Sequence, residues 1–281
     1  MTRVAVVGSY GVGLTFGVDR APERGETRVG TLFRRDDGGK GSNQAVGAAR
    51  LGAEVTFLTA VGRDAFGDRA HELWAEEGVD AAAVLRVPEP TMTAAILVEG
   101  SGDNRIVIVP GALSTLAPSH VDGFAKQIAA ADVLLVQLEI PVETALHALE
   151  VGRDAGVRTI LNPAPAPPQP ISPRADYVVP NESEARAVAG AEGMLVLTLG
   201  EEGARLGEEI IPAYPARVVD TTGAGDAFCG AFAVALAEGA SDEEAVRWGC
   251  AAGAHMVEHE GVVPGLPTRA QLEERLAVTA A

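Results

Sequence analysis

Short runs of β-branched and other apolar residues alternate with alanine-rich, helix-like stretches along most of this chain. Residues 3–8, 54–60 and 132–138 read as strands, and stretches such as 41–51 and 143–155 read as helices. Because a strand that is followed by a helix and a further strand forms a βαβ unit, the alternation predicts a mostly parallel sheet flanked by helices. The expected fold class is therefore α/β.

Two segments interrupt this alternation, at about residues 14–36 and 83–109. They contain extended stretches with Pro and Gly between them and little sign of helix. Both leave and re-enter the α/β body, as an insertion does. We therefore expect a single domain over residues 1–281, with a small inserted β-sheet built from these two segments.

Charge and cysteine content exclude several classes of partner. The chain has 39 acidic and 22 basic residues, a formal net charge of −17, so it repels polyanions and argues against nucleic acid and anionic membranes. No apolar run approaches the ~18–20 residues of a membrane helix. Cys229 and Cys250 show neither a zinc-ligand nor a C-x-x-C spacing. A cytoplasmic location fits these features best.

The glycines after the first strand do not form a dinucleotide-binding turn. Gly8, Gly11 and Gly13 have the spacing G-x-x-G-x-G, whereas the fingerprint requires G-x-G-x-x-G at the start of a helix. The residues that follow, 14–18, favour a strand. This segment therefore argues against an oxidoreductase.

The sharpest motif is Asp-Thr-Thr-Gly-Ala-Gly-Asp-Ala-Phe at residues 220–228. Gly223, Ala224 and Gly225 offer successive N–H groups at the start of a helix, which suits phosphate charge. Asp226 in the first turn could act only as a helix stabiliser. Beside an anion hole, however, it has the position of a general base for phosphoryl transfer, and we favour that interpretation.

Two further segments supply groups for a polyhydroxylated ligand. Residues 38–43, Gly-Gly-Lys-Gly-Ser-Asn, bring the cation of Lys40 and the amide of Asn43 to a helix N-terminus. The alternative is a plain glycine turn with a solvated lysine. Glu139 ends a predicted strand and could accept hydrogen bonds from sugar hydroxyls, although a glutamate at a strand end is otherwise a solvated surface group.

Asn181 and Glu184 open a predicted helix directly after a strand. One interpretation is a capping box, in which the two residues satisfy each other's backbone N–H groups. A carboxylate at this edge of a sheet can also hold a Mg²⁺–phosphate complex through water. In open α/β sheets ligands bind at the carboxyl edge, so both interpretations stay open.

Together these segments resemble the ribokinase family of carbohydrate kinases, also called the PfkB family, and within it the ribokinase branch. The resemblance implies a ribokinase-like sheet with a β-sheet lid, and ATP-dependent transfer of the γ-phosphoryl group to a hydroxyl of a small carbohydrate. It also implies Mg²⁺, K⁺ and a homodimer formed through the lid. The similarity runs from residue 4 to 267, with the two family signatures at 38–45 and 220–228 and ribokinase-like context at 137–139, 162–166 and 180–184.

The resemblance also implies roles for single residues. Asp226 would be the base, in an anion hole of Gly223, Ala224 and Gly225. The sugar site would comprise Gly11, Gly13, Gly39, Lys40, Gly41, Asn43, Glu139 and Asp226. The ATP site would comprise Asn181, Thr198, Gly200, Glu201, Gly203, Gly225 and Cys250. Glu184 would organise Mg²⁺ through water, and Asp220 and Thr222 would hold the monovalent cation.

The chain departs from the family pattern in two places. Ribokinases carry Asn and Asp where this chain has Gly11 and Gly13, and that Asp grips adjacent sugar hydroxyls, so the difference puts ribose itself in doubt as the acceptor. Between Glu184 and Leu199 there is room for one short helix, where the family usually has two. We therefore expect a trimmed nucleotide side.

Three functions fit these observations: a sugar or polyol kinase, a nucleoside kinase of the same family, and a non-catalytic sugar or nucleotide sensor. The intact glycine run around Asp226 favours an enzyme. A nucleoside kinase needs an apolar or aromatic base pocket in the lid, for which Phe16 and Phe33 are the obvious candidates.

Overall fold

The computed structural model describes residues 1–277 and is built on a nine-stranded sheet. Its strands are β1 (Arg3–Val7), β4 (Glu54–Leu58), β6 (Val79–Asp80), β10 (Val133–Gln137), β11 (Arg158–Asn162), β12 (Arg174–Val178), β13 (Glu192–Thr198), β14 (Ala204–Leu206) and β15 (Glu209–Ile211). Their order is β15-β14-β13-β12-β11-β10-β1-β4-β6. All neighbours from β13 to β6 are parallel, and β13, β14 and β15 pair antiparallel. The α/β fold class is therefore confirmed.

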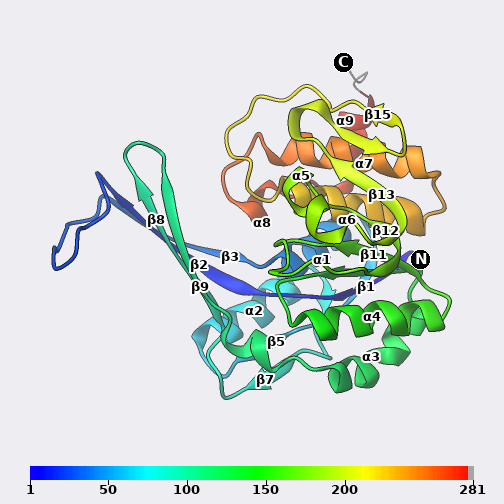
Figure 1. Ribbon diagram of the computed structural model, residues 1–281, viewed down its shortest axis with the longest axis horizontal. Coiled ribbons are helices and arrows are strands. Elements are labelled where there is room, and N and C mark those ends of the chain that lie inside the picture. The colour runs from blue at the N-terminus through cyan, green and yellow to red at the C-terminus, as the bar shows by residue number, and fades with distance from the viewer. Residues whose placement is uncertain (278–281) are drawn as a thin grey trace.

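Helices cover both faces of this sheet (Figure 1). One face packs against α3 (Pro118–Ala130) and α4 (Val142–Asp154), and the other against α1 (Lys40–Arg50), α2 (Ala65–Glu76), α6 (Ala224–Ala237), α7 (Asp242–Met256) and α9 (Arg269–Ala277). Val4 and Val6 of β1 belong to one apolar core, whereas Ala5 and Val7 belong to the other. Since successive residues of a strand point to opposite faces, a strand that is apolar throughout has to be covered on both sides.

Short elements complete the body. A two-stranded parallel sheet joins β5 (Ala60–Gly62) to β7 (Leu85–Val87), and α8 (Val262–Gly265) precedes α9. Between Glu184 and Leu199 the chain forms only α5 (Glu182–Ala185) and a 3₁₀ turn, Arg186–Val188, before β13 begins. Within residues 1–277, no helix has the length and apolar character of a membrane span.

A separate four-stranded sheet extends away from the body (Figure 1). It consists of β2 (Gly11–Val18), β3 (Leu32–Gly38), β8 (Met92–Glu99) and β9 (Asn104–Val109), in the order β3-β2-β8-β9. The two outer pairs are antiparallel and the central pair is parallel. The expected small sheet is present, but it begins at Gly11 instead of residue 14. The second segment joins it only from Met92, because Leu85–Val87 pairs with β5 in the body.

The register of this four-stranded sheet defines two faces. Gly13 pairs with Asp36, and Phe16 pairs with Phe33. Since directly paired residues share a face and the side-chain period is two, Gly13 and Asp36 lie on one face, and Phe16 and Phe33 lie on the other. We call the first the α8 face, because Arg34 on it forms an ion pair with Glu260 just before α8. The second is the α2 face.

Candidate active site

Polar residues from several distant segments meet at the carboxyl edge of the central sheet. Gln137 and Asn162 end β10 and β11, and Asn181 follows β12. The N-termini of α1 and α6 lie at the same edge, where Asn43 of α1 contacts Asp226 of α6. The fold therefore assembles a polar site where open α/β sheets bind their ligands.

Asp226 is the buried carboxylate of this site. It is the third residue of α6, and only 5% of it is exposed. Nδ2 of Asn43 donates to its Oδ2 over 2.8 Å, and Nε2 of Gln44 donates to its Oδ1 over 3.0 Å. A buried charge has to be hydrogen-bonded to be tolerated, and these two donors also fix the direction of both oxygen atoms.

A chain of buried amides supports Asp226 from behind. Nε2 of Gln44 also donates to Oδ1 of Asn162 over 3.1 Å, and the side-chain Oε1 of Gln44 accepts from Nε2 of Gln137 over 2.6 Å. Asn162 in turn donates to the carbonyl oxygen of Val179. Sequence reasoning did not select Gln44, Gln137 or Asn162 as site residues. The available signal was a polar side chain at the end of a buried strand, or beside Asn43 on the same helix.

The start of α6 is a glycine-rich turn with unpartnered backbone N–H groups. Gly223 has φ +83°, and a Cβ there would lie 2.6 Å from Cγ1 of Val262, so both backbone and packing require glycine. A Cβ on Gly225 would meet nothing within 4 Å, so the space there is open. Within residues 1–277, no backbone carbonyl accepts from the N–H groups of Gly225 and Asp226. They remain available to an anion, together with the positive end of the helix dipole.

Lys40 and Glu139 lie beside the same site. Oε2 of Glu139 accepts from the backbone N–H of Lys40 over 2.8 Å and from Oγ of Ser9 over 2.5 Å. Burial alone would lower the pKa of Lys40, but the carboxylates of Asp226 and Glu139 outweigh it and raise the pKa above its ordinary value. Lys40 is therefore a firmly protonated cation among carboxylates. Gly39 and Gly41 lie against Tyr10 and Ser9, which lets α1 start close to β1.

Asn43 carries an unsatisfied acceptor. It is 4% exposed, and its Oδ1 has no hydrogen-bond partner within the part of the chain that the structure describes. A buried polar atom without a partner is costly. This oxygen can therefore accept a further hydrogen bond beside Asp226.

Asn181 and Glu184 form the capping box that was one of their two interpretations. Oδ1 of Asn181 accepts from the backbone N–H of Glu184, and Oε2 of Glu184 accepts from the backbone N–H of Asn181, both over 2.9 Å. The second oxygen of Glu184 takes no part in the box. Burial raises the pKa of this carboxyl, of which 8% is exposed. A buried carboxylate whose ionised form is disfavoured would gain from a cation or its bound water.

The other residues expected at the nucleotide gather around β13 and its hairpin. Thr198 forms a bridge with Asn181. Gly200 and Glu201 lie in the 3₁₀ turn Gly200–Glu202, and Gly203 follows it. Cys250 on α7 is buried with its Sγ 3.9 Å from the carbonyl oxygen of Ile211, and burial raises its thiol pKa to about 12.

Asp220 and Thr222 lie in the turn that leads into α6. Oδ1 of Asp220 accepts from the backbone N–H of Thr222 over 2.9 Å. Burial opposes ionisation of Asp220, but hydrogen bonds from Thr222 and from the backbone of Gly261 hold its pKa below the ordinary value. Within residues 1–277, no three His, Cys, Asp or Glu side chains gather as a metal-ligand cluster. A divalent ion bound near Glu184 would therefore need water or phosphate oxygens as its main ligands.

Gly11 and Gly13 lie on β2, on the α8 face of the four-stranded sheet. Neither has a positive φ. A Cβ on Gly13 would meet only Cδ1 of Ile96 at 3.5 Å and the carbonyl oxygen of Asp36 at 3.9 Å. Backbone conformation and space therefore both allow a side chain at position 13.

Comparisons with known proteins find matches over nearly the whole length of this chain. The family model described as pfkB family carbohydrate kinase matches residues 1–269. A ribokinase of Bacillus subtilis is 39% identical over 293 residues, covering 99% of this chain and 100% of the relative. A deoxyribokinase of Salmonella typhi is 33% identical over 302 residues, covering 98% and 99%. The structure of an Arabidopsis thaliana ribokinase complexed with ribose and ATP has a TM-score of 0.90 and 31% identity, covering 99% of this chain and 100% of that one.

The α/β fold and the comparisons together define the class of protein: the chain is a phosphoryl-transferring enzyme. The chain belongs to the pfkB family of carbohydrate kinases. It is an ATP-dependent carbohydrate kinase, and the resemblance to the ribokinase branch is confirmed.

Proposed function

We propose that this kinase phosphorylates a primary hydroxyl of a small sugar, with Asp226 as the general base. The observation that carries this role is the buried Asp226 carboxylate, held by Asn43 and Gln44 beside unpartnered N–H groups of α6. A base next to an anion site is the arrangement that phosphoryl transfer requires.

The proposed step is an in-line displacement at the γ-phosphorus of ATP. The acceptor hydroxyl oxygen forms a bond to phosphorus as its proton passes to the Asp226 carboxylate. The bond from phosphorus to the bridging oxygen breaks, and ADP leaves with that electron pair. The N–H groups of Gly223, Gly225 and Asp226 stabilise the negative charge on the transferred group, whereas that of Ala224 donates to the carbonyl oxygen of Thr221 over 3.3 Å.

The sugar side of the site supplies complementary hydrogen-bonding groups. We assign the unpartnered Oδ1 of Asn43 to an acceptor hydroxyl, because that atom is buried beside the proposed base. Lys40 donates to hydroxyl oxygens, and the oxygen of Glu139 that its two short contacts leave free accepts from hydroxyl groups. Gly39 and Gly41 let the chain approach closely.

The residues present fit an ATP–Mg²⁺ complex. We assign the nucleotide to Asn181, Thr198, Gly200, Glu201, Gly203, Gly225 and Cys250. Glu184 supplies the carboxylate that binds Mg²⁺ through water, and the ion would neutralise phosphate charge. We assign a K⁺ ion to the Asp220 carboxylate and the Thr222 carbonyl. The low pKa of Asp220, which keeps its charge, is compatible with a cation there.

The register of the four-stranded sheet argues against a nucleoside as the acceptor. Phe16 and Phe33, the aromatic candidates for a base pocket, are 5.3 Å apart between ring centroids. They lie on the α2 face, opposite to Gly13 and Asp36. Exposed by 42% and 63%, they cannot form a base pocket on the side of Asp220 and α8.

The same exposed surface supports a homodimer formed through the lid sheet. Phe16 and Phe33 are exposed on the α2 face, where the register also places Val107 and Val109 of β9, and Ile106 and Ile108 of β9 are exposed on the opposite face. Exposed apolar side chains gathered on one small sheet mark an interaction site, and a second copy of this sheet would cover them. We also place the protein in the cytoplasm, supported by its two buried, unpaired cysteines.

The test is an ADP-release assay with a panel of pentoses, hexoses, cyclic polyols and nucleosides. We expect turnover with at least one sugar or polyol, loss of that turnover in Asp226→Asn, and poor activity with every nucleoside. Ligand binding without ADP production in the presence of Mg²⁺ would identify a sensor instead. Light scattering of the purified protein tests the homodimer.

A further inference from the structure

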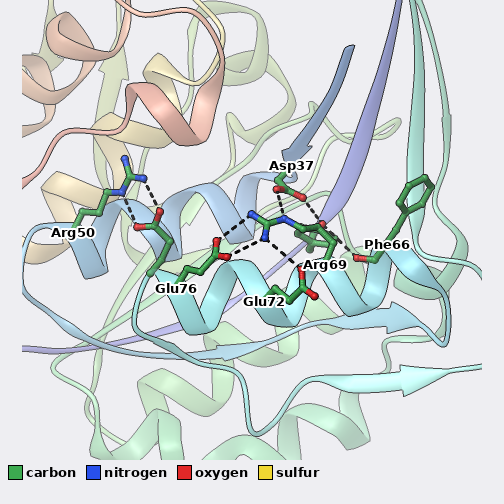
Figure 2. A network of polar contacts seen from close by, with 8 residues as sticks. Asp37, Arg50, Phe66, Arg69, Glu72 and Glu76 are labelled. Carbon is green, nitrogen blue, oxygen red and sulfur yellow. Dashed lines mark hydrogen bonds and ion pairs between the residues drawn. The ribbon is translucent and has the colours of Figure 1, made fainter. Parts of the chain in front are cut away.

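Two neighbouring carboxylates of β3, Asp36 and Asp37, point to opposite faces of the lid sheet. Asp37 is fully engaged on the α2 face: it accepts from the hydroxyl of Tyr10 over 2.7 Å and from Nε of Arg69 over 3.2 Å. Figure 2 shows Arg69 reaching from α2 to Asp37 and to Glu72 and Glu76. Asp37 therefore ties the base of the lid to the body.

Asp36 is not used in this way. Its Oδ2 accepts from Nε of Arg34 over 2.6 Å, and within residues 1–277 its Oδ1 has no partner. Its side chain is 36% exposed. The pair Arg34 and Asp36 is therefore oriented but still open to a ligand.

The α8 face, which carries this pair, turns toward the phosphate end of the site. Arg34 contacts Glu260 and is close enough to Asp220 to help hold its pKa low. Asp220 opens the turn that leads to the anion-facing start of α6. Along the chain, Asp36 precedes Gly39 by three residues, about 10 Å at ~3.3 Å per strand residue. One small sugar and one side chain can span that distance to the start of α1.

The residue directly opposite Asp36 in the sheet carries no side chain. Its register partner is Gly13, and Cβ atoms of directly paired residues lie about 4.5–5.5 Å apart. Position 13 has an ordinary φ and accepts a Cβ, which would lie 3.5 Å from Cδ1 of Ile96, yet it is a glycine. No side chain of its paired residue therefore covers the Asp36 carboxylate on the α8 face.

We infer that Asp36, oriented by Arg34, is the specificity-determining carboxylate of the lid. It binds a pair of adjacent hydroxyl groups on the part of the acceptor that is remote from the reacting hydroxyl. Because Gly13 carries no side chain, the acceptor beside Asp36 is larger than a free pentose, such as a hexose, a cyclic polyol or a substituted pentoside. This inference rests on the proposed sugar kinase function.

The test compares Asp36→Asn and Asp36→Ala with the matched control Asp37→Asn on the other face. With the best acceptor of the panel, we expect the two Asp36 variants to raise the acceptor KM about ten- to a hundredfold. The KM for ATP and the kcat at saturating acceptor should stay within about twofold. Asp37→Asn should leave the acceptor KM unchanged, even if it lowers the melting temperature.

A deoxy analogue of the acceptor sharpens the experiment. Wild type should lose about tenfold or more in kcat/KM when one of the remote hydroxyls is missing, and Asp36→Ala should show no further loss. An unchanged acceptor KM in both Asp36 variants, or an equal deoxy penalty in wild type and variant, overturns the inference while the kinase function stands. Absence of turnover in wild type with every acceptor overturns the proposed function instead.

Discussion

Nε2 of Gln44 lies 3.0 Å from Oδ1 of Asp226 and directs that carboxylate oxygen from a second helix. The two residues are separated by 182 positions in the sequence, so only the packing of α1 against α6 brings them together. The same amide also reaches Asn162. The orientation of the proposed base therefore depends on a buried network and not on α6 alone.

Replacement of Asp226 by Asn should nearly abolish turnover. The amide keeps the size of the side chain but cannot accept a proton, and general-base catalysis is typically worth ~10²–10⁴-fold. ATP binding, measured by calorimetry, should stay within a few-fold, because proton acceptance matters mainly as the transition state forms. A variant that keeps more than about a tenth of wild-type kcat would remove Asp226 from the role of base.

Gln44→Leu should weaken both the fold and the reaction. It leaves Gln137 and Asn162 with buried polar atoms that have lost a partner, which costs ~1–3 kcal/mol. We expect a lower free energy of unfolding in urea. We also expect a reduced kcat with little change in the KM for ATP, because the Asp226 carboxylate loses one of its two hydrogen-bond donors. Wild-type kcat in a folded Gln44→Leu protein would show that Asn43 alone suffices.

Glu184→Gln should stabilise the protein at neutral pH while it impairs activity. The folded-state pKa of Glu184 is raised by burial, so the ionised carboxylate destabilises the fold above that pKa. Gln keeps the capping box but has no charge to bury. The gain in the free energy of unfolding should be present at pH 7.5 and vanish as the pH falls below about 4.3, the unfolded value. An equal gain at pH 7.5 and pH 3.5 would contradict this origin.

Activity should require Mg²⁺ and rise in K⁺ relative to Na⁺. The Mg²⁺ requirement is expected from the buried Glu184, and the K⁺ effect is expected from Asp220 in the turn before α6. Rates are compared in matched potassium, sodium and tetramethylammonium buffers, with and without EDTA. Equal rates in the three buffers would reject the monovalent site and leave the Mg²⁺ requirement untouched.

Ribose should be a poor acceptor compared with the best member of the panel. Each charge-assisted hydrogen bond that a carboxylate in place of Gly13 would make is worth ~1.5–3 kcal/mol, about ten- to more than a hundredfold in affinity. Because Gly13 has no positive φ and a Cβ there would meet only ordinary contacts, Gly13→Asp should be tolerated and should improve kcat/KM for ribose. If ribose is the best wild-type substrate, this account of the pocket is wrong.

The strands, helices and separate sheet could be predicted because hydrophobic periodicity and glycine turns are local signals. The glycine-rich turn at 220–228 is a local signal of the same kind. The amide network could not be predicted, since it joins Gln44, Gln137, Asn162 and Asp226 across the whole chain. The faces of the lid sheet could not be predicted either, because a one-residue slip in register would move the Phe16 side chain to the opposite face. For that reason the sequence could not assign Phe16, Phe33 or Asp36 to one face of this sheet.

Helix α6 is buried along nearly its whole length, and Asp226 lies at its first turn. The proposed base is thus attached to a part of the molecule whose backbone amides should exchange with solvent only when the entire domain opens. The lid strands, with their exposed β9, belong to the opposite end of that range. Heating should therefore loosen the four-stranded sheet well before the Asp226 carboxylate loses its orientation.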